Sequence, residues 1–200
     1  MNAESYGQQK LTVVDKLGVY LSRRPVMKVV ERYDRATVLD IGCGYHAELL
    51  RALEPRIARG VGIDARVSPE LAGNPKLAFF EQTIEQAMPE LAKEKFDVIL
   101  MVSVLEHLWE PQEVLTSLRG LLTAGGSLVV NVPNWLGKTF LEVSAFKLGM
   151  SPADSIDDHK TYYWKEQLWP LLVRAGFKPS KIAMRYHKLG LNLFAVARAE

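Results

Sequence analysis

The strongest constraint on the fold is the run of residues 38–45, which reads Val-Leu-Asp-Ile-Gly-Cys-Gly-Tyr. A short apolar segment that ends at two closely spaced glycines predicts a buried parallel strand followed by a tight turn. Gly42 and Gly44 lack a Cβ atom, so this turn can adopt positive φ and a ligand can approach its backbone closely. Asp40 narrows the choice further, because dinucleotide-binding folds usually have an apolar residue two positions before the first glycine.

Strand-like and helix-like patterns alternate from this run to residue 133, at a spacing typical of βαβ units. Strands are expected at 38–41, 60–63, 77–80, 96–102 and 127–132, and helices near 47–53, 84–91 and 111–122. The segment 96–102 is apolar apart from Asp97, which suits a strand buried on both faces of a parallel sheet. The alternation therefore predicts an α/β fold with a doubly wound, mostly parallel sheet and helices on both faces.

The alternation stops at Pro133. A short helix near 137–148 and a polar loop at 151–158 form a connection that is longer than most in compact domains. Such insertions are often lids or substrate-binding elements, although this one could also be an insertion without a function.

The two ends of the chain have simpler patterns. A helix over 165–175 is expected to end at Gly176. Strands at 179–186 and 191–197 are close enough in sequence to pair as an antiparallel hairpin. The stretch 11–33 reads as one or two helices, which either cap a ligand pocket or only cover the sheet.

The composition fits one globular domain of 200 residues, 48% hydrophobic and 24% charged, with a formal net charge of +2. So small a charge argues against nucleic-acid binding by bulk electrostatics. No stretch of about 18 apolar residues is present, and residues 1–10 lack the apolar part of a secretory signal. A cytoplasmic protein without membrane or nucleic-acid partners is therefore expected. Cys43 is the single cysteine, and no His or Asp is spaced to make it a nucleophile.

The run 38–45 resembles motif I of the class I S-adenosylmethionine-dependent methyltransferases, and later segments resemble further motifs of the small-molecule branch of that family. These segments are Asp64 at the end of the second strand, Gln82-Thr83-Ile84, 96–99 with 104–108, 118–126, Pro133-Asn134 and Asp158-His159. The resemblance covers roughly residues 36–200. It implies a seven-stranded sheet in the order 3-2-1-4-5-7-6, in which only the last strand is antiparallel.

The resemblance also implies S-adenosylmethionine as the cofactor and S-adenosylhomocysteine as the product. Asp64 would accept both ribose hydroxyls, Ile84 would stack on the adenine, and Gln82 or Thr83 would bind the edge of the base. Asp64 could instead cap the next short helix. The residues expected at the cofactor are Asp40, Gly42, Cys43, Gly44, Asp64, Ala65, Gln82, Thr83, Ile84, Ser103 and His107.

Several positions depart from the family pattern: Ala124 replaces the usual Pro, Gln82-Thr83 stands where the family often has an Asp, and two further departures bear on the site. His46 stands where motif I usually has a third small residue. Its imidazole either reaches toward the methionyl end of the cofactor or points outward at the start of the helix. Trp164 stands where related sequences often have a Thr N-cap, which suggests that it is retained for packing or for substrate contact.

The sulfonium of S-adenosylmethionine is already activated, so methyl transfer by in-line displacement requires binding, alignment and exclusion of water. An acceptor that must lose a proton needs a base, and His107 and His159 are the catalytic candidates because imidazole titrates near neutral pH. His107 could instead pair with Glu106 or a backbone carbonyl. The side chains expected to face the acceptor are Trp135, His159 and Tyr162, together with His107. No metal is expected, because no acids and histidines lie at ligand spacing along the sequence.

The leading hypothesis is methyl transfer to an oxygen or nitrogen of a small molecule. Gly42-x-Gly44-x-x-Ala47 also fits a loose dinucleotide fingerprint, which keeps an NAD-dependent oxidoreductase open. A non-catalytic S-adenosylmethionine-binding partner of another protein is a further alternative. We expect a monomer or homodimer with one domain, divided into an N-terminal helical cap (1–35), a cofactor-binding core (36–133), an insertion or lid (134–160), and a C-terminal helix and hairpin (161–200).

Overall fold

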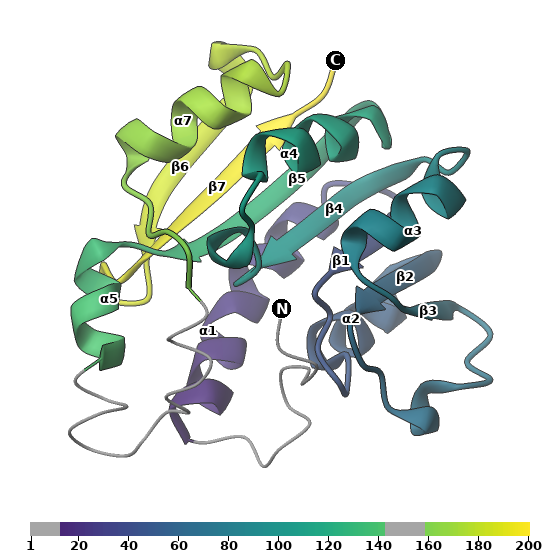
Figure 1. The fold of residues 1–200 in the computed structure, drawn as a ribbon. Coiled ribbons are helices and arrows are strands. Elements are labelled where there is room, and N and C mark those ends of the chain that lie inside the picture. The colour runs from purple at the N-terminus through teal and green to yellow at the C-terminus, as the bar shows by residue number, and fades with distance from the viewer. Residues whose placement is uncertain (1–12, 143–158) are drawn as a thin grey trace.

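The structure, a computed structural model, describes residues 13–142 and 159–200 (Figure 1). Its centre is a seven-stranded sheet in the order β3-β2-β1-β4-β5-β7-β6. The strands are β1 (Thr37–Ile41), β2 (Arg59–Asp64), β3 (Leu77–Glu81), β4 (Phe96–Val102), β5 (Leu122–Pro133), β6 (Ile182–His187) and β7 (Asn192–Arg198). β7 is antiparallel to both of its neighbours, and the remaining neighbours are parallel. The predicted order and the antiparallel last strand are confirmed.

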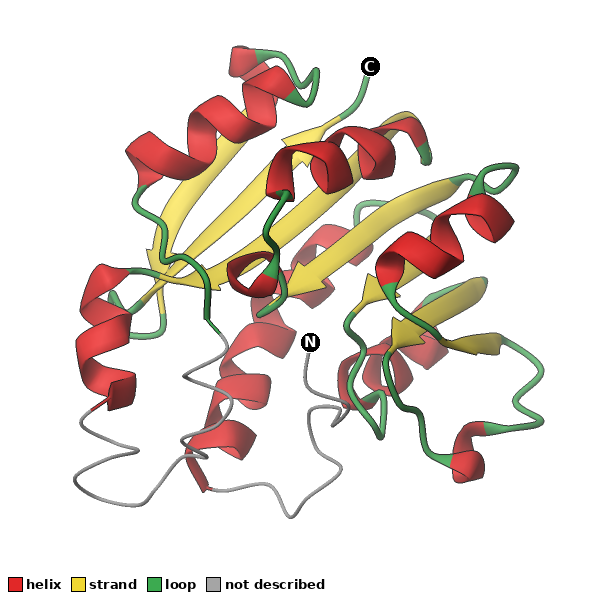
Figure 2. Ribbon diagram, viewed as in Figure 1, coloured by secondary structure: helices red, strands yellow, loops and turns green. Residues whose placement is uncertain are grey.

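Helices cover both faces of the sheet, as predicted (Figure 2). The helices are α1 (Val13–Val30), α2 (Glu48–Leu53), α3 (Ile84–Leu91), α4 (Pro111–Gly120), α5 (Trp135–Glu142) and α7 (Lys165–Arg174). Apolar residues of α3, α4 and α7 form one core with one face of the sheet, and those of α1 and α2 form a second core with the other face. Because successive side chains of a strand point to opposite faces, Leu39 of β1 lies in the first core and Val38 in the second.

Several boundaries differ from the expectations. β5 begins at Leu122, not at residue 127, because Leu122 pairs with Phe96 before an irregular stretch that restores regular pairing at Ser127 opposite Val98. The helix expected over 111–122 therefore ends earlier, at Gly120.

The N-terminal pattern forms one helix, α1, with a proline inside it at position 25. α5 begins two residues before the expected start at residue 137. The rest of the expected helix 137–148, after residue 142, and the loop 151–158 lie outside the described residues. Within the described parts of the chain, no helix combines the length and the apolar character needed to cross a bilayer.

Candidate cofactor and acceptor site

The glycine turn after β1 is held against the end of β2 by backbone hydrogen bonds. Gly42 and Gly44 have φ values of 67° and 78°, in the left-handed region that favours glycine. The N–H groups of Gly42 and Cys43 donate to the carbonyl of Ile63, over 2.8 and 3.0 Å. The Gly44 N–H donates to Oδ2 of Asp64 over 2.7 Å. The sequence thus folds into an open backbone turn with a carboxylate at its side.

Asp40 brings a second carboxylate to the same turn. Its side chain is buried, and Oδ2 has no hydrogen-bond partner in the described structure. Burial, with a smaller contribution from Asp64, raises the pKa of Asp40 to about 8. A pocket beside it is lined by Val19, Ser22, Asp40, Gly42, Cys43, Gly44, His46, Ala47, Glu48, Leu49 and Val102. A buried acid without a partner at a pocket wall favours a ligand that carries a donor or a positive charge.

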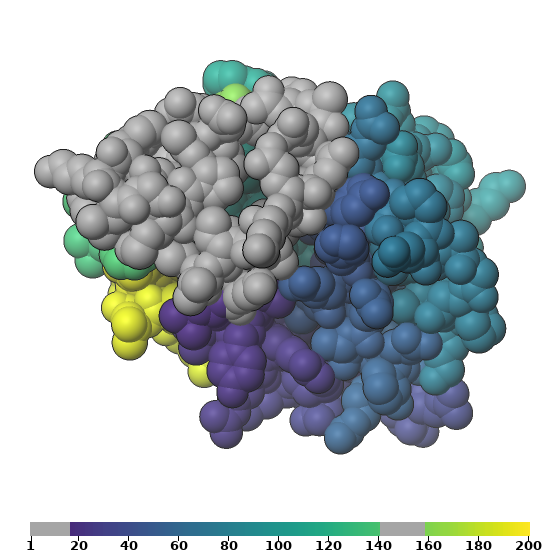
Figure 3. Space-filling model, turned by 90° about the horizontal axis from the view of Figure 1, so that it is seen from below, coloured from purple at the N-terminus to yellow at the C-terminus, as the bar shows by residue number. Residues whose placement is uncertain are grey.

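The pocket places α1 beside the motif I turn. In Figure 3, which views the molecule from below Figure 1, α1 (purple) lies against the segment that follows β1 (blue). His46 is among the residues that line this pocket, and its ring lies 4.9 Å from that of Tyr45. Burial raises the pKa of the Cys43 thiol above its ordinary value, which is the environment of an inert cysteine and not of a nucleophile.

Asp64 does not cap the next short helix, so this alternative is wrong. Ser68 does so, because its hydroxyl accepts the N–H of Glu70 over 3.3 Å. Asp64 and Ala65 are only partly buried at the end of β2. The backbone carbonyl of Asp64 accepts the N–H of Gln82 over 2.9 Å, which brings the residues after β3 to the same edge.

The three residues predicted to hold the adenine have structural roles of their own. Thr83 caps α3 through a reciprocal pair with Gln86, at 3.4 and 3.0 Å. Ile84 is 5% exposed and packs into the core, so it offers little surface to a base. Gln82 donates to Glu90 over 3.0 Å, while its Oε1 is buried and unpartnered among the described residues. Of the three, Gln82 has the acceptor that an adenine amino group needs.

The structure brings together the four side chains predicted to face the acceptor. The rings of His107 and His159 are 4.7 Å apart, those of His159 and Tyr162 are 5.2 Å apart, and those of Tyr162 and Trp135 are 5.6 Å apart. Nδ1 of His159 also forms a 2.9 Å hydrogen bond with the Tyr162 hydroxyl. The four residues come from the turn after β4, from α5 and from the segment before α7, and together they form a continuous aromatic cluster.

Two charged residues near this cluster were not predicted as site residues, although Glu106 was considered as a partner of His107. Glu106 is 1% exposed, and its Oε2 has no hydrogen-bond partner in the described structure. Burial raises the pKa of Glu106 to about 8. Lys188, in the hairpin turn between β6 and β7, has a pKa lowered to about 8 by burial, an effect that the charge of Glu106 opposes. The sequence contains no local signal for this pair, since its members are 82 positions apart.

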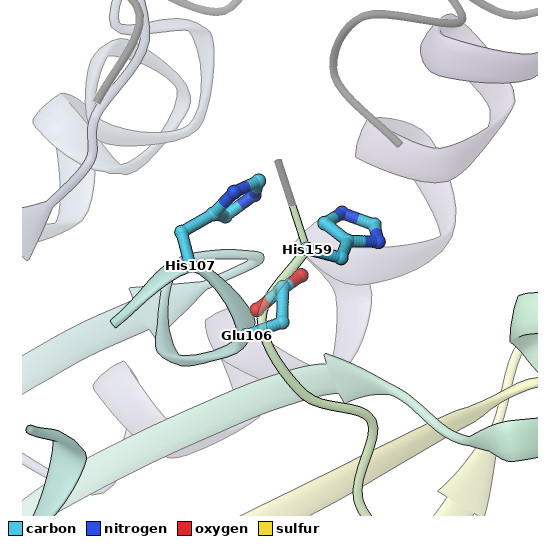
Figure 4. A group of neighbouring side chains, drawn as sticks. All are labelled: Glu106, His107 and His159. Atoms are coloured by element: carbon cyan, nitrogen blue, oxygen red, sulfur yellow. The ribbon is translucent and has the colours of Figure 1, made fainter. Parts of the chain in front are cut away.

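The expectation that acids and histidines are not clustered is wrong for the described residues. Glu106, His107 and His159 each place a potential ligand atom within 4.8 Å of the other two. In Figure 4 the Glu106 carboxylate lies below and between the two imidazole rings. Spacing along the sequence missed this cluster because His159 joins it from a distant segment.

The remaining predicted positions lie at the same edge. Ser103 follows β4 with a φ of 58°, and its N–H donates to the carbonyl of Asn131 over 2.8 Å. Asn134 caps α5 by accepting the Gly137 N–H over 2.8 Å, and it donates to the Gly190 carbonyl over 2.6 Å. Trp164 is the N-cap residue of α7 without a side-chain cap bond; its ring contacts Tyr186, with centroids 6.4 Å apart.

The fold and the glycine turn after β1 indicate the general class of this protein. The sheet reverses its strand order between β1 and β4, and the glycine turn lies at the carboxyl end of β1. Doubly wound α/β proteins bind nucleotide-like cofactors at such a switch point. Comparison with known families then gives the narrower assignment. The methyltransferase domain matches residues 19–181, so this chain belongs to that family, and the predicted resemblance is confirmed.

Individual relatives agree with this assignment. A ubiquinone biosynthesis O-methyltransferase of Caulobacter vibrioides is 30% identical over 165 residues, which are 76% of this chain and 62% of that protein. Among solved structures, a SAM-dependent methyltransferase of Archaeoglobus fulgidus has a TM-score of 0.65 at 15% identity, covering 93% of this chain and 99% of that one. The N-methyltransferase NodS of Bradyrhizobium japonicum, solved with S-adenosyl-l-homocysteine, has a TM-score of 0.58 at 16% identity, covering 89% and 85%.

The two kinds of likeness carry different weight. At these identities the solved structures show a shared fold. The chain spans about half to three fifths of the length of the ubiquinone biosynthesis O-methyltransferases that it matches.

Proposed function

We propose that this protein transfers the methyl group of S-adenosylmethionine to an oxygen or nitrogen atom of a small molecule. The observation that carries this proposal is the buried carboxylate of Asp40, whose Oδ2 has no hydrogen-bond partner among the described residues, at the wall of a pocket beside a positive-φ glycine turn. These residues fit a cofactor that has a cationic centre and hydrogen-bond donors. Bound there, S-adenosylmethionine would supply a methyl group already activated by its sulfonium.

The residues of the pocket divide the work of holding that cofactor. Gly42 and Gly44 let it approach the backbone, and Asp40 offers a buried carboxyl oxygen beside them that can accept a hydrogen bond from the cofactor. Asp64 accepts the Gly44 N–H through Oδ2 over 2.7 Å and the Arg66 N–H through Oδ1 over 3.5 Å, and we assign its carboxylate to the ribose. Gln82 would bind the adenine edge through its buried Oε1. His46, at the pocket wall, would contact the methionyl end.

We assign the acceptor to the aromatic cluster of Trp135, Tyr162, His159 and His107. Aromatic faces bind flat or apolar acceptors, and an imidazole can remove the proton of a hydroxyl or amine. Methyltransferases named for oxygen and for nitrogen acceptors are both among the similar proteins, which supports keeping both classes of acceptor in the proposal.

Two segments are proposed to close this site. The N-terminal part, 1–35, would cap the pocket, because Val19 and Ser22 of α1 line it. The insertion 134–160 would act as a lid that keeps water from the acceptor. Shortening the insertion between residues 143 and 158 should then lower turnover at nearly constant cofactor affinity. Equal losses of turnover and affinity would indicate that the insertion only supports the fold.

Calorimetry and a turnover assay test the function. Titration with S-adenosylmethionine, S-adenosylhomocysteine and NAD should show binding of the first two compounds only; binding of NAD alone would favour an oxidoreductase. Transfer of a labelled methyl group should then be measured over a panel of phenols, hydroxy acids and amines. Cofactor binding without transfer to any of them would favour the non-catalytic partner protein.

A further inference from the structure

The cluster of Glu106, His107 and His159 has the composition of a metal site. Its potential ligand atoms, one carboxylate oxygen and two imidazole nitrogens, lie within 4.8 Å of one another. The carboxylate is 1% exposed, and its Oε2 lacks a hydrogen-bond partner in the described structure. A buried carboxylate oxygen in this condition is costly unless a cation or a donor joins it. We propose that these three side chains bind a divalent transition-metal ion.

The backbone holds the two contributing segments together. The carbonyl of Glu106 accepts the N–H groups of Lys160 and Thr161, over 2.7 and 3.2 Å. The segment that carries His159 is therefore attached directly to the residue that supplies the carboxylate. The turn that carries Glu106 and His107 is closed by a hydrogen bond from the His107 N–H to the Val104 carbonyl, over 2.9 Å. These backbone hydrogen bonds fix the relative positions of the two segments, as a preorganised site requires.

Tyr162 orients one of the two imidazoles. The Tyr162 hydroxyl lies 2.9 Å from Nδ1 of His159, and Tyr162 is buried, with 5% of its surface exposed. With Nδ1 protonated and donating to this hydroxyl, Nε2 of His159 carries the lone pair that a metal needs. Histidine ligands usually have such a partner on their second nitrogen, and its loss typically lowers metal affinity by about 10–100-fold.

The donor set decides which metals fit. Two imidazoles and one carboxylate suit Zn²⁺, Co²⁺, Mn²⁺ or Fe²⁺, whereas Mg²⁺ and Ca²⁺ prefer oxygen ligands. Around a tetrahedral ion with bonds of about 2.1 Å, ligand atoms are roughly 3.4 Å apart. The three side chains would therefore have to close by no more than about 1.4 Å, which rotation about their χ angles supplies. One coordination position would remain for water or an acceptor oxygen.

Lys188, in the hairpin turn between β6 and β7, adds a positive charge whose effect reaches Glu106. A positive charge there opposes the binding of a metal ion. This gives the metal site a signature that misfolding cannot reproduce: loss of a ligand weakens binding, whereas loss of the lysine charge strengthens it. If His107 and His159 were ligands, they could not act as bases. A metal ion would instead lower the pKa of an acceptor hydroxyl or water bound to it, so that the proton leaves more readily.

Titration of the tag-free chain with Co²⁺, followed by its visible absorption, tests the proposal directly. We expect one Co²⁺ per chain, displaced by Zn²⁺. Glu106→Gln and His159→Asn should each abolish the absorption, Tyr162→Phe should weaken binding by about 10–100-fold, and Lys188→Met should tighten it several-fold. His46→Gln removes a histidine outside the cluster and should leave the Co²⁺ affinity unchanged.

The outcomes separate this inference from the proposed function. A chain that binds S-adenosylhomocysteine but shows no saturable Co²⁺ binding overturns the metal site and leaves the methyltransferase proposal intact. Co²⁺ binding that survives both Glu106→Gln and His159→Asn also overturns it, since the ion would then be bound elsewhere. Co²⁺ binding with the expected dependence, in a chain that binds neither form of the cofactor, supports the metal site and contradicts the proposed function.

Discussion

Replacing Gly42 with alanine tests how tightly the motif I turn is built against the segment that follows β4. Gly42 has a φ of 67°, and a Cβ atom added there would lie well inside 3.0 Å of a methyl group of Val104, closer than real Cβ atoms come to other atoms. Val104 begins the turn that leads to Glu106 and His107. The substitution therefore strains the point where the proposed cofactor and acceptor halves of the site meet.

Two costs add up in this variant. Placing alanine in the left-handed region costs about 1–2 kcal/mol, and forcing a methyl group into a filled space costs about 1–3 kcal/mol. Val104 cannot relieve the overlap cheaply, because a β-branched side chain has few allowed rotamers. The free energy of unfolding should therefore fall by about 2–5 kcal/mol. Gly125 is the matched control: its φ is 77°, and nothing lies within 4 Å of an added Cβ, so Gly125→Ala should cost only about 1–2 kcal/mol.

Urea unfolding of both variants, with and without Val104→Ala, measures these costs. In the Val104→Ala background the overlap is gone, so Gly42→Ala should cost no more than Gly125→Ala, with a coupling energy of at least about 1 kcal/mol. Affinity for S-adenosylhomocysteine should be restored in parallel. If Gly42→Ala costs the same in both backgrounds, Val104 does not constrain the turn and the reasoning is refuted.

Three other predictions concern single side chains. Asp64→Ala should weaken S-adenosylhomocysteine binding by about 1.5–3 kcal/mol in calorimetry. Glu81→Gln, at the end of the neighbouring strand, should leave this binding unchanged. Equal effects of the two changes would show that Asp64 does not bind the ribose. Because the pKa of Asp40 is raised from 3.8 to about 8, the native state holds a proton that the unfolded state has lost between these values. Stability should therefore fall as pH rises from about 4 to about 8, and less steeply in Asp40→Asn; identical slopes would contradict the burial effect. Asn134→Ala, which removes the α5 cap, should cost about 1–2 kcal/mol in urea unfolding, and an unchanged midpoint would show that the cap is dispensable.

The strand order could be predicted because each strand has its own apolar run and the helices between the strands leave few arrangements. The start of β5 could not be predicted, since it depends on Leu122 pairing with Phe96 across the sheet. In sequence, the glycine pair before Ser127 is typical of a turn that precedes a strand. In the structure these glycines lie within an irregular part of the strand, where the register shifts.

Most of the cofactor half of the site could be predicted, because its residues lie close together in the sequence. Asp40, Gly42 and Gly44 belong to one short run, and Asp64 ends the next strand of the same sheet, so parallel pairing alone brings them together. The sequence does not show which structural roles the residues after β3 have. Thr83 and Ile84 are of the residue types expected at an adenine. In the structure, however, Thr83 caps α3 and Ile84 packs into the core.

The acceptor half depends on contacts between segments that are distant in sequence. Its aromatic members could be proposed one by one, but the Glu106 carbonyl, which holds the segment after His159, gives no signal in the sequence. Asn134 fixes the opposite side by joining the start of α5 to Gly190 in the last hairpin, and the same hairpin turn delivers Lys188. The buried acid and the two imidazoles therefore meet because backbone hydrogen bonds join segments that are distant in sequence. The chemistry of this half is set by charges that meet only in the folded chain.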